Sequence, residues 1–272
     1  MASLSEELKS YTAVVITGGS SGIGKSFIKL TAKLNADLVF CNLSRRDPEI
    51  INLGKRLNHF ACDLSRAAEV AGVAVEVETW LRREVPAGRV LLINNSGFGS
   101  YGPFPEPNLP QQLEIMDVNM RALVQFTGLM LPLLRERGGA VINIASTAAF
   151  QPTAFMATYG ASKTFVLHWS LAVNEELRGT GVRMLAVCPG ATATGFFQRA
   201  GMQPGNALER SGMACDEVVT MALRALADGR SQVVTGWKNK LSAFAGSLPP
   251  KPLAARVAAK IVARFRLKKA SA

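Results

Sequence analysis

Short apolar runs alternate with longer helical patterns along most of the chain. Seven runs have the length and composition of strands, at residues 13–16, 37–43, 58–62, 89–93, 140–144, 182–188 and 232–235. Most of the segments between them have helical periodicity over ten residues or more. Parallel strands joined by such helices form right-handed crossovers and a sheet that is buried on both faces. The sequence therefore predicts an α/β fold, a doubly wound parallel sheet of about seven strands with helices on both faces.

The composition is that of one globular domain. The chain has 272 residues, of which 48% are hydrophobic and 19% are charged, and this length suits one large α/β core. It has no uninterrupted apolar run of about 18 residues, and the N-terminus, with Glu6 and Glu7, lacks the apolar segment of a signal peptide. We therefore expect a cytoplasmic protein with a single domain over residues 1–250, followed by a basic segment over residues 251–272.

The net charge of +11 is compatible with nucleic acid, a membrane surface or an anionic ligand as partner. Part of the excess lies after Pro250, where basic residues cluster without acidic ones. No basic stripe carries interleaved aromatic residues, so we expect no nucleic-acid partner. The cysteines lack the spacing of a metal site, so we predict no metal and interpret them as buried thiols; they are Cys41, Cys62, Cys188 and Cys215.

A glycine-rich loop, Thr17–Gly24, follows the first predicted strand and leads directly into a helical pattern. Glycines allow a tight turn, and the start of a helix presents free N–H groups and a positive dipole end to a pyrophosphate. A glycine turn without a ligand is the alternative, and the position between a strand and a helix favours the binding loop. The candidate cofactor contacts here are Gly18, Ser20, Ser21, Gly22, Ile23 and Gly24.

The second predicted strand ends in Ser44, Arg45 and Arg46. In a dinucleotide fold this position reaches the adenosine ribose, where a carboxylate binds the free 2′-hydroxyl of NAD and an arginine accommodates the 2′-phosphate of NADP. Ser44 and Arg45 are the candidate contacts, and the absence of an acidic residue predicts NADP(H). Surface arginines that bind nothing are the alternative.

Polar and small residues also stand where the other predicted strands end. Ligands of open α/β sheets bind outside the carboxyl ends of the strands, so these residues are expected to line one crevice with the glycine loop. The Asp63 carboxylate could accept a hydrogen bond from the adenine amino group. The remaining candidate contacts are Asp63, Leu64, Asn95, Ser96, Gly97, Pro189, Gly190, Thr192 and Thr194.

Tyr159 and Lys163 are the candidates for acid/base chemistry. Four positions along a helix bring two side chains to one face, about one turn apart. A neighbouring ammonium lowers the pKa of a tyrosine from about 10, so the hydroxyl becomes a usable acid or base. An ordinary amphipathic helix is the alternative. Asn119 lies inside a helical pattern over residues 111–137, and its poor helix propensity indicates either a tolerated polar residue or a distorted backbone.

These motifs resemble those of the short-chain dehydrogenase/reductase family in its classical, NADP-preferring form, which has a Rossmann fold. The resemblance covers roughly residues 11–195 and rests on the order and spacing of the motifs. They are Thr17–Gly24, Asp63, Asn94–Gly97, Asn119, Ser146, Tyr159–Lys163 and Pro189–Gly190 with Thr194. One departure is Ser96, where the family most often has alanine.

The resemblance implies a catalytic tetrad of Asn119, Ser146, Tyr159 and Lys163. In such a tetrad Tyr159 is the acid/base and Ser146 binds the substrate oxygen. Lys163 holds the ribose and lowers the pKa of the tyrosine, while Asn119 anchors a relay water. The implied activity is the NADP(H)-dependent interconversion of a ketone or aldehyde with an alcohol. A catalytically silent cofactor-binding scaffold is the alternative, and the complete tetrad favours activity.

The resemblance assigns the variable substrate loop to residues 191–215. Aromatic side chains and one methionine in and beside this loop suggest an apolar pocket for an acyl, steroid-like or lipid-like small molecule, although core packing explains some of them equally well. These residues are Phe98, Phe104, Phe150, Phe155, Met156, Phe196 and Phe197.

The helices predicted at residues 111–137 and 155–177 suggest a homodimer or homotetramer, since the family commonly pairs them. The second helix has apolar residues on two sides, with one stripe of Phe165, Val166, Trp169 and Val173 and another of Leu167 and Leu171. One side could pack on the sheet and the other on a partner. Burial of both sides within one subunit is the alternative.

Residues 251–269 have the pattern of an amphipathic helix in which an apolar stripe lies beside a basic one. The apolar stripe is Leu253, Val257, Ile261 and Phe265, and the basic stripe is Arg256, Lys260 and Arg264. One interpretation is a terminal helix packed on its own domain or on a neighbouring subunit. The other is a peripheral membrane contact with anionic lipid.

Overall fold

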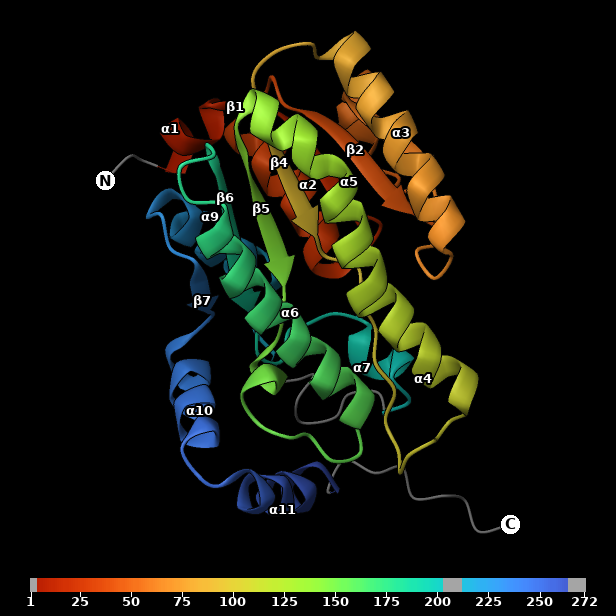
Figure 1. Ribbon diagram of the computed structural model, residues 1–272, viewed down its shortest axis with the longest axis vertical. Helices are drawn as coiled ribbons and strands as arrows, with labels where there is room; N and C mark the ends of the chain where they lie inside the picture. The colour runs from red at the N-terminus through yellow and green to blue at the C-terminus, as the bar shows by residue number, and fades with distance from the viewer. Residues whose placement is uncertain (1–3, 203–211, 264–272) are drawn as a thin grey trace.

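The computed structural model of the protein describes residues 4–202 and 212–263. Seven strands form one parallel sheet in the order β3-β2-β1-β4-β5-β6-β7 (Figure 1). They are β1 (Tyr11–Thr17), β2 (Val39–Ser44), β3 (Leu57–Ala61), β4 (Arg89–Asn94), β5 (Gly139–Ile144), β6 (Val182–Cys188) and β7 (Gln232–Val234). The predicted fold class is confirmed, and the strand ends differ from the predicted ones by two residues at most.

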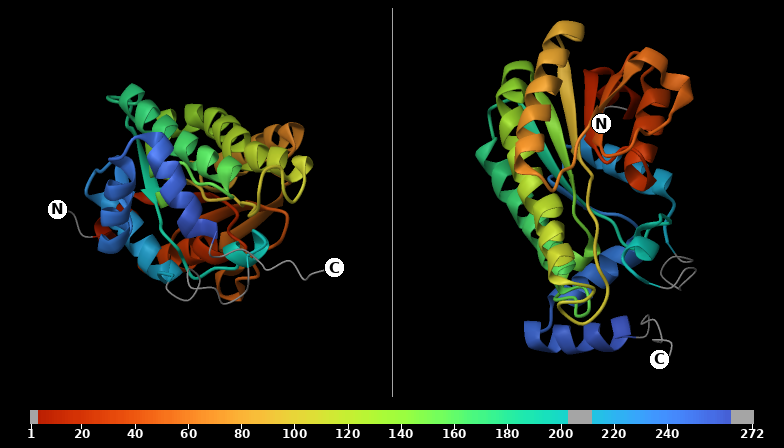
Figure 2. Two further views of the ribbon diagram at one scale, coloured as in Figure 1. Left: turned by 90° about the horizontal axis from the view of Figure 1, so that it is seen from below. Right: turned by 90° about the vertical axis from the view of Figure 1, so that its right-hand side faces the viewer.

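Helices cover both faces of the sheet because its strands are apolar on both faces. Along β1, Ala13 and Val15 pack on one side, while Val14 and Ile16 pack on the other. The first side is covered by α3 (Ala67–Glu84), α5 (Ala122–Arg137) and α6 (Ala157–Glu176). The second side is covered by α1 (Leu4–Lys9), α2 (Gly22–Leu34) and α9 (Cys215–Ala227). Figure 2 shows these two layers with the sheet between them.

Several shorter elements gather at the end of the molecule where the strand arrows point (Figure 1). They are α4 (Leu109–Met116), η3 (Thr147–Phe150), α7 (Phe196–Arg199), α10 (Trp237–Ser247) and α11 (Lys251–Val262). A further 3-10 segment, η1 (Ile51–Arg56), connects β2 to β3. Ligands of open α/β sheets bind at the carboxyl edge, so this end of the molecule holds the candidate site.

The structure differs from the sequence analysis in a few elements. The helix predicted over residues 111–137 is divided by a π-helical turn, η2 (Asp117–Arg121), which contains Asn119. The distorted-backbone interpretation of Asn119 is therefore confirmed. The sequence pattern predicts no helix at α1, α7 or α10. Two of these are short, and α10 contains Asn239 and Gly246, which have low helix propensity.

Candidate active site

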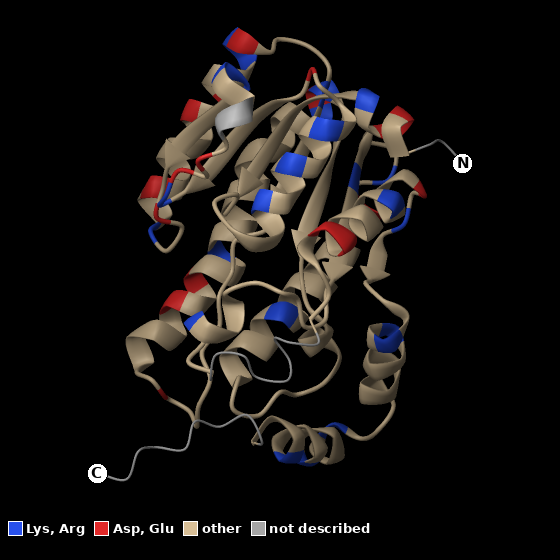
Figure 3. Ribbon diagram, turned by 180° about the vertical axis from the view of Figure 1, so that it is seen from behind, with Lys and Arg blue, Asp and Glu red and all other residues tan. Residues whose placement is uncertain are grey.

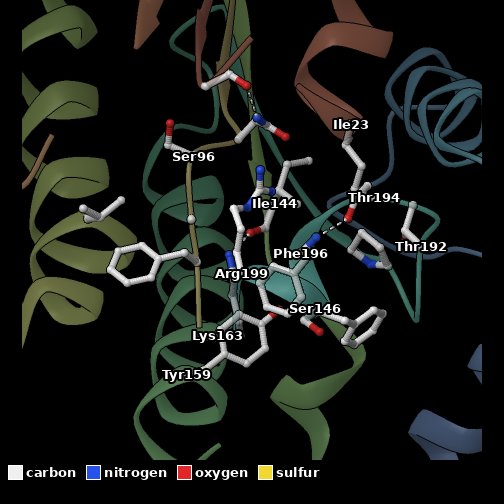
Figure 4. Close-up of a pocket in the computed structure, with 18 of the residues that line it drawn as sticks. Ile23, Ser96, Ile144, Ser146, Tyr159, Lys163, Thr192, Thr194, Phe196 and Arg199 are labelled. Carbon is white, nitrogen blue, oxygen red and sulfur yellow. Dashed lines mark hydrogen bonds between the residues drawn. The ribbon is translucent and has the colours of Figure 1, made fainter. Parts of the chain in front are cut away.

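A cavity of about 750 Å³ opens at the carboxyl edge of the sheet (Figure 4). All of the predicted site residues line it except Gly24 and Asn119. Those that line it are Gly18, Ser20, Ser21, Gly22, Ile23, Ser44, Arg45, Asp63, Leu64, Asn95, Ser96, Gly97, Ser146, Tyr159, Lys163, Pro189, Gly190, Thr192 and Thr194. The ends of successive strands therefore meet around one space, as their order in the sequence predicted.

The glycine loop between β1 and α2 is closed so tightly that side chains would not fit. Gly18 has a φ of +70°, and a Cβ there would lie 2.6 Å from the Ser96 hydroxyl oxygen. A Cβ on Gly24 would run into the Gly18 carbonyl, so Gly24 shapes the loop from outside the cavity. Ser21 precedes α2 and makes no capping hydrogen bond with its side chain, and the first turn carries no acidic residue. The loop and the start of this helix fit a pyrophosphate.

Cationic side chains line the cavity near the end of β2. Arg45 and Arg46 follow the strand directly, and Arg199 comes from α7. Burial lowers the pKa of Arg199, and the charge of nearby Arg46 lowers it further. Two like charges in one cavity favour an anionic ligand between them. Arg45 lies 3.9 Å from the Glu114 carboxylate, an exposed pair that contributes little to stability.

The Asp63 carboxylate is held at the end of β3 by a local turn. Its Oδ1 accepts hydrogen bonds from the Ser65 N–H at 3.0 Å and from the Ser65 hydroxyl at 2.8 Å. Partial burial raises the pKa of Asp63, but these hydrogen bonds and the nearby Arg45 outweigh it, so the pKa lies below its ordinary value. Asp63 is therefore an ionised acceptor at the cavity wall.

Ser146, Tyr159 and Lys163 lie together in the cavity, as Figure 4 shows. Ser146 follows β5, and its hydroxyl oxygen accepts a hydrogen bond from the Ala148 N–H at 3.1 Å. Lys163 is only 5% exposed, and its Nζ donates to the Ile144 carbonyl at 2.7 Å. The same Nζ stands 5.8 Å from the centre of the Tyr159 ring. The spacing of four on α6 has brought the pair to one face, as expected.

The pKa values of this group follow burial. Burial raises the pKa of Tyr159 to about 12, and the hydrogen bond with Ser146 acts in the opposite direction. Burial also lowers the pKa of Lys163 to about 8. The expected net lowering of the Tyr159 pKa is not present in this structure, because burial outweighs the hydrogen bond with Ser146.

Asn119 lies behind the cavity wall, where it is 1% exposed. Its Nδ2 donates to the Phe98 carbonyl at 3.0 Å and to the Ser162 hydroxyl at 2.9 Å, while its Oδ1 accepts from the Phe98 N–H at 3.1 Å. A Cβ on Gly97 would lie 3.1 Å from both Asn119 Oδ1 and Lys163 Nζ. The π-helical turn therefore places Asn119 where it holds the Gly97–Phe98 backbone beside Lys163.

Apolar side chains line the part of the cavity nearest Tyr159. Phe98, Met156, Phe196 and Phe197 do so as predicted, and the Phe196 ring centre lies 5.1 Å from that of Tyr159. Three other candidates do not line it. Phe150 packs beside α6 and β6 and Phe155 packs behind the wall, so the core-packing alternative holds for these two. Phe104 is 68% exposed, and its assignment to the pocket was wrong.

Arg199 and Val262 are among the lining residues that the sequence did not mark. Arg199 lies inside the variable loop, where no pattern marked it. Val262, from α11, also lines the cavity, and its carbonyl accepts a hydrogen bond from the Tyr101 hydroxyl at 2.7 Å. The terminal helix is therefore part of the cavity wall.

The family profile described as short chain dehydrogenase matches residues 12–204. The protein is a short-chain dehydrogenase/reductase. It is 30% identical over 183 residues to the ketoacyl reductase HetN of Nostoc sp., a match that covers 65% of this chain and 62% of that protein. It is 31% identical over 189 residues to a very-long-chain 3-oxoacyl-CoA reductase of Pyricularia oryzae, covering 66% of this chain and 56% of that protein.

Solved structures of the family have the same fold. A short-chain dehydrogenase from Sphingobium yanoikuyae in complex with NADPH has a TM-score of 0.72 and 27% identity, covering 96% of this chain and 98% of that one. A short-chain dehydrogenase/reductase from Burkholderia phymatum in complex with NAD has a TM-score of 0.73 and 22% identity. The match covers 86% of this chain and 92% of that one. The solved relatives thus include both an NADPH and an NAD complex.

Proposed function

We propose that the protein is an NADP(H)-dependent oxidoreductase that interconverts a ketone or aldehyde with an alcohol. The observation that carries this proposal is that Ser146, Tyr159 and Lys163 share one cavity with the glycine loop. A cofactor bound at the glycine loop would therefore share this cavity with a substrate placed next to the acid/base group.

The preference for NADP(H) is supported by the charges at the end of β2. Arg45 and Arg46 stand where a 2′-phosphate would lie in a dinucleotide fold, and Ser44 precedes them in place of a carboxylate. Arg199 adds a third cation to the same cavity. The glycine loop and the start of α2 would hold the pyrophosphate, and Asp63 would accept from the adenine amino group.

The protein's own side chains handle the proton and the developing charge. A bound nicotinamide supplies or accepts the hydride. During reduction, Ser146 and Tyr159 donate hydrogen bonds to the carbonyl oxygen as it gains charge, and the Tyr159 hydroxyl then delivers its proton there. Lys163, which lies beside Tyr159, would hold the ribose of the cofactor. With its ammonium directed toward the Tyr159 hydroxyl, it would also lower the pKa of that phenol. Asn119 keeps the Gly97–Phe98 backbone in place, as its hydrogen bonds indicate.

The substrate we propose is apolar, with an acyl, lipid-like or steroid-like body. Phe98, Phe196, Phe197 and Met156 surround the space next to Tyr159, and Val262 closes it from the side of α11. The names of two similar proteins, a ketoacyl reductase and a 3-oxoacyl-CoA reductase, fit an acyl ketone.

The variant Tyr159→Phe tests the activity. We expect turnover of NADPH with a panel of apolar ketones and aldehydes to be lost, while NADPH binding, followed by fluorescence titration, stays nearly unchanged. A Phe variant with the rates of the unaltered protein would show the mechanism to be wrong. An unaltered protein that binds NADPH and reduces no carbonyl in the panel would favour a cofactor-binding scaffold instead.

We also propose a homodimer or homotetramer through α4, α5 and α6. Most of the predicted stripe residues are used within the subunit, since Val166 and Leu167 are buried and Trp169, Val173 and Leu171 pack against the core. A second set on these helices is exposed, namely Leu109, Leu113, Met116, Leu129 and Phe165. Light scattering at micromolar concentration tests this, and a monomer alone would contradict it.

A further inference from the structure

Helices α10 and α11 expose their large apolar side chains. Fourteen large hydrophobic residues are exposed among those the structure describes, and half of them lie between residues 237 and 261. They are Trp237, Leu241, Phe244, Leu248, Leu253, Val257 and Ile261. We call this set the apolar surface. Single exposed apolar residues are common, but seven of them on two successive helices indicate a contact with something else.

Within α11, the small residues face the domain and the large ones face outward. Ala254 is 5% exposed, whereas Leu253, Val257 and Ile261, at spacings of four, are between 50% and 53% exposed. The inward side of the helix also includes Val262, which lines the cavity. The apolar stripe predicted from the sequence is therefore present at Leu253, Val257 and Ile261, but it points away from the protein. Arg264 and Phe265, which the prediction also included, lie outside the described residues.

Helix α10 is oriented in the same way. Ala243 is 2% exposed and faces the domain, where Asn239 and Gly246 share its side of the helix. Contacts there are close, because a Cβ on Gly190 would run into Asn239 and a Cβ on Gly246 would run into Gln151. The inward face is thus occupied, and Trp237, Leu241 and Phe244 stand on the outer face.

The charged residues on α10 and α11 all have one sign. Five basic side chains on α10 and α11 are exposed, namely Lys238, Lys240, Lys251, Arg256 and Lys260. The sequence contains no Asp or Glu after Asp228. Figure 3 shows both helices with blue residues and no red ones. Any partner must therefore offer apolar contact together with negative charge.

We propose that α10 and α11 rest on a membrane surface that contains anionic lipid. An apolar stripe bordered by lysines and arginines is the pattern of a helix that lies in the headgroup region, where Trp237 is also favoured. A second copy of the same surface fits poorly, because it would bring five cations against five others without a carboxylate. None of the helices in residues 4–202 and 212–263 combines the length and apolar character that a bilayer crossing requires.

The proposed membrane contact is coupled to the cavity. The two helices lie at the same end of the molecule as the carboxyl ends of the strands (Figure 1). Val262 belongs to α11 and lines the cavity, and the Tyr101 hydroxyl fixes its carbonyl at 2.7 Å. If the proposed function holds, the active-site cavity would lie close to the lipid surface in which an apolar substrate dissolves.

Flotation with lipid vesicles tests the proposal. The full chain is mixed with phosphatidylcholine vesicles that either contain or lack phosphatidylglycerol. We expect flotation with the anionic vesicles and loss of flotation at high salt. The triple variant Lys251→Glu, Arg256→Glu, Lys260→Glu should reduce the bound fraction about tenfold or more, because it replaces attraction with repulsion. Leu241→Ser with Val257→Ser should weaken binding without changing charge.

A matched control makes the same charge change elsewhere. Lys29, Lys33 and Arg224 are exposed on α2 and α9, and their triple replacement by Glu should leave flotation unchanged. Equal losses in both triple variants, or no flotation of the unaltered protein, would overturn the proposal. So would light scattering that shows a dimer lost on Leu241→Ser with Val257→Ser. Flotation requires no turnover, so it can fail or succeed independently of the carbonyl reductase assay.

Discussion

Helices α2 and α11 have similar amphipathic sequences and bury opposite faces. In α2, Phe27 and Ile28 are fully buried, while Lys29 and Lys33 are exposed. In α11, the small Ala254 is buried and the large apolar residues stand outside with the basic ones. Periodicity alone shows that a helix has two faces. It does not show which face the protein covers.

The position of each helix in the chain explains the difference. Helix α2 is a crossover between β1 and β2, so its apolar face must cover the sheet between them. Helix α11 comes after β7, the strand at the edge, and no later strand among the described residues requires it to cover the sheet. It meets the domain at the cavity end, where Ala254 is buried and Val262 lines the cavity. We infer that α2 contributes to stability and α11 to contact with a partner.

Truncating one apolar residue in each helix tests this difference directly. Phe27→Ala should cost about 3–5 kcal/mol of unfolding free energy, because it leaves a cavity in the core. Ile261→Ala should change it by less than about 0.5 kcal/mol, because the side chain is already 53% exposed. Urea unfolding measures both. Similar losses in the two variants would show that α11 is a core helix after all.

Much of the fold and site could be predicted because their signals are local. The strands are apolar on both faces, as in Ala13 to Ile16, so each stood out as a continuous run. Ser146 stands where β5 ends, and Tyr159 and Lys163 are four apart on one helix. Strand ends and helix spacing fix these positions without knowledge of tertiary contacts.

The features that could not be predicted depend on contacts between distant segments. Val262 reaches the cavity only because α11 folds back beneath Tyr101, a contact between residues 161 positions apart. Arg199 joins Arg46 through the placement of α7. The raised pKa of Tyr159 comes from burial, which the spacing to Lys163 does not reveal.

The variant Arg45→Asp tests the cofactor preference at the end of β2, where Arg45 lines the cavity. The change replaces a cation that can pair with a 2′-phosphate by an anion that suits a free ribose hydroxyl. We expect a loss of about 1.5–3 kcal/mol in NADPH binding, or roughly 10- to 100-fold, and a preference for NADH. Titration with both cofactors measures the ratio. Equal affinities of the unaltered protein for NADPH and NADH would contradict the assignment.

Lys163 is a buried cation, whereas the buried Phe27 and Ile28 of α2 are apolar. Burial lowers its pKa from 10.5 to about 8, so its charged form destabilises the folded protein. Lys163→Met should raise the unfolding free energy at pH 7 by roughly 2 kcal/mol, after allowing for the lost hydrogen bond to Ile144. The same variant should lose activity, as stabilising changes in active sites commonly do.

The pH dependence distinguishes this effect from simple repacking. Below about pH 8 the ammonium is present in both folded and unfolded chains, so the penalty is full. Between about pH 8 and 10.5 the unfolded chain holds more protons, and the stability of the unaltered protein rises relative to the Met variant. The gap between the two should therefore close across this range. A gap that stays constant would mean that the charge of Lys163 carries no penalty.

The smallest expected changes in stability and cofactor affinity come from the residues that precede α4 and α2. Asn108 caps α4, since its Oδ1 accepts from the Gln111 N–H at 2.9 Å, whereas Ser21 before α2 makes no such bond and lines the cavity. Asn108→Ala should cost about 1 kcal/mol of stability and leave NADPH affinity unchanged. Ser21→Ala should leave stability within about 0.5 kcal/mol and weaken NADPH binding roughly 2- to 10-fold. Urea unfolding and cofactor titration on both variants separate the two roles. If Ser21→Ala destabilised the protein as much as Asn108→Ala, the start of α2 would be a structural cap and not a binding surface.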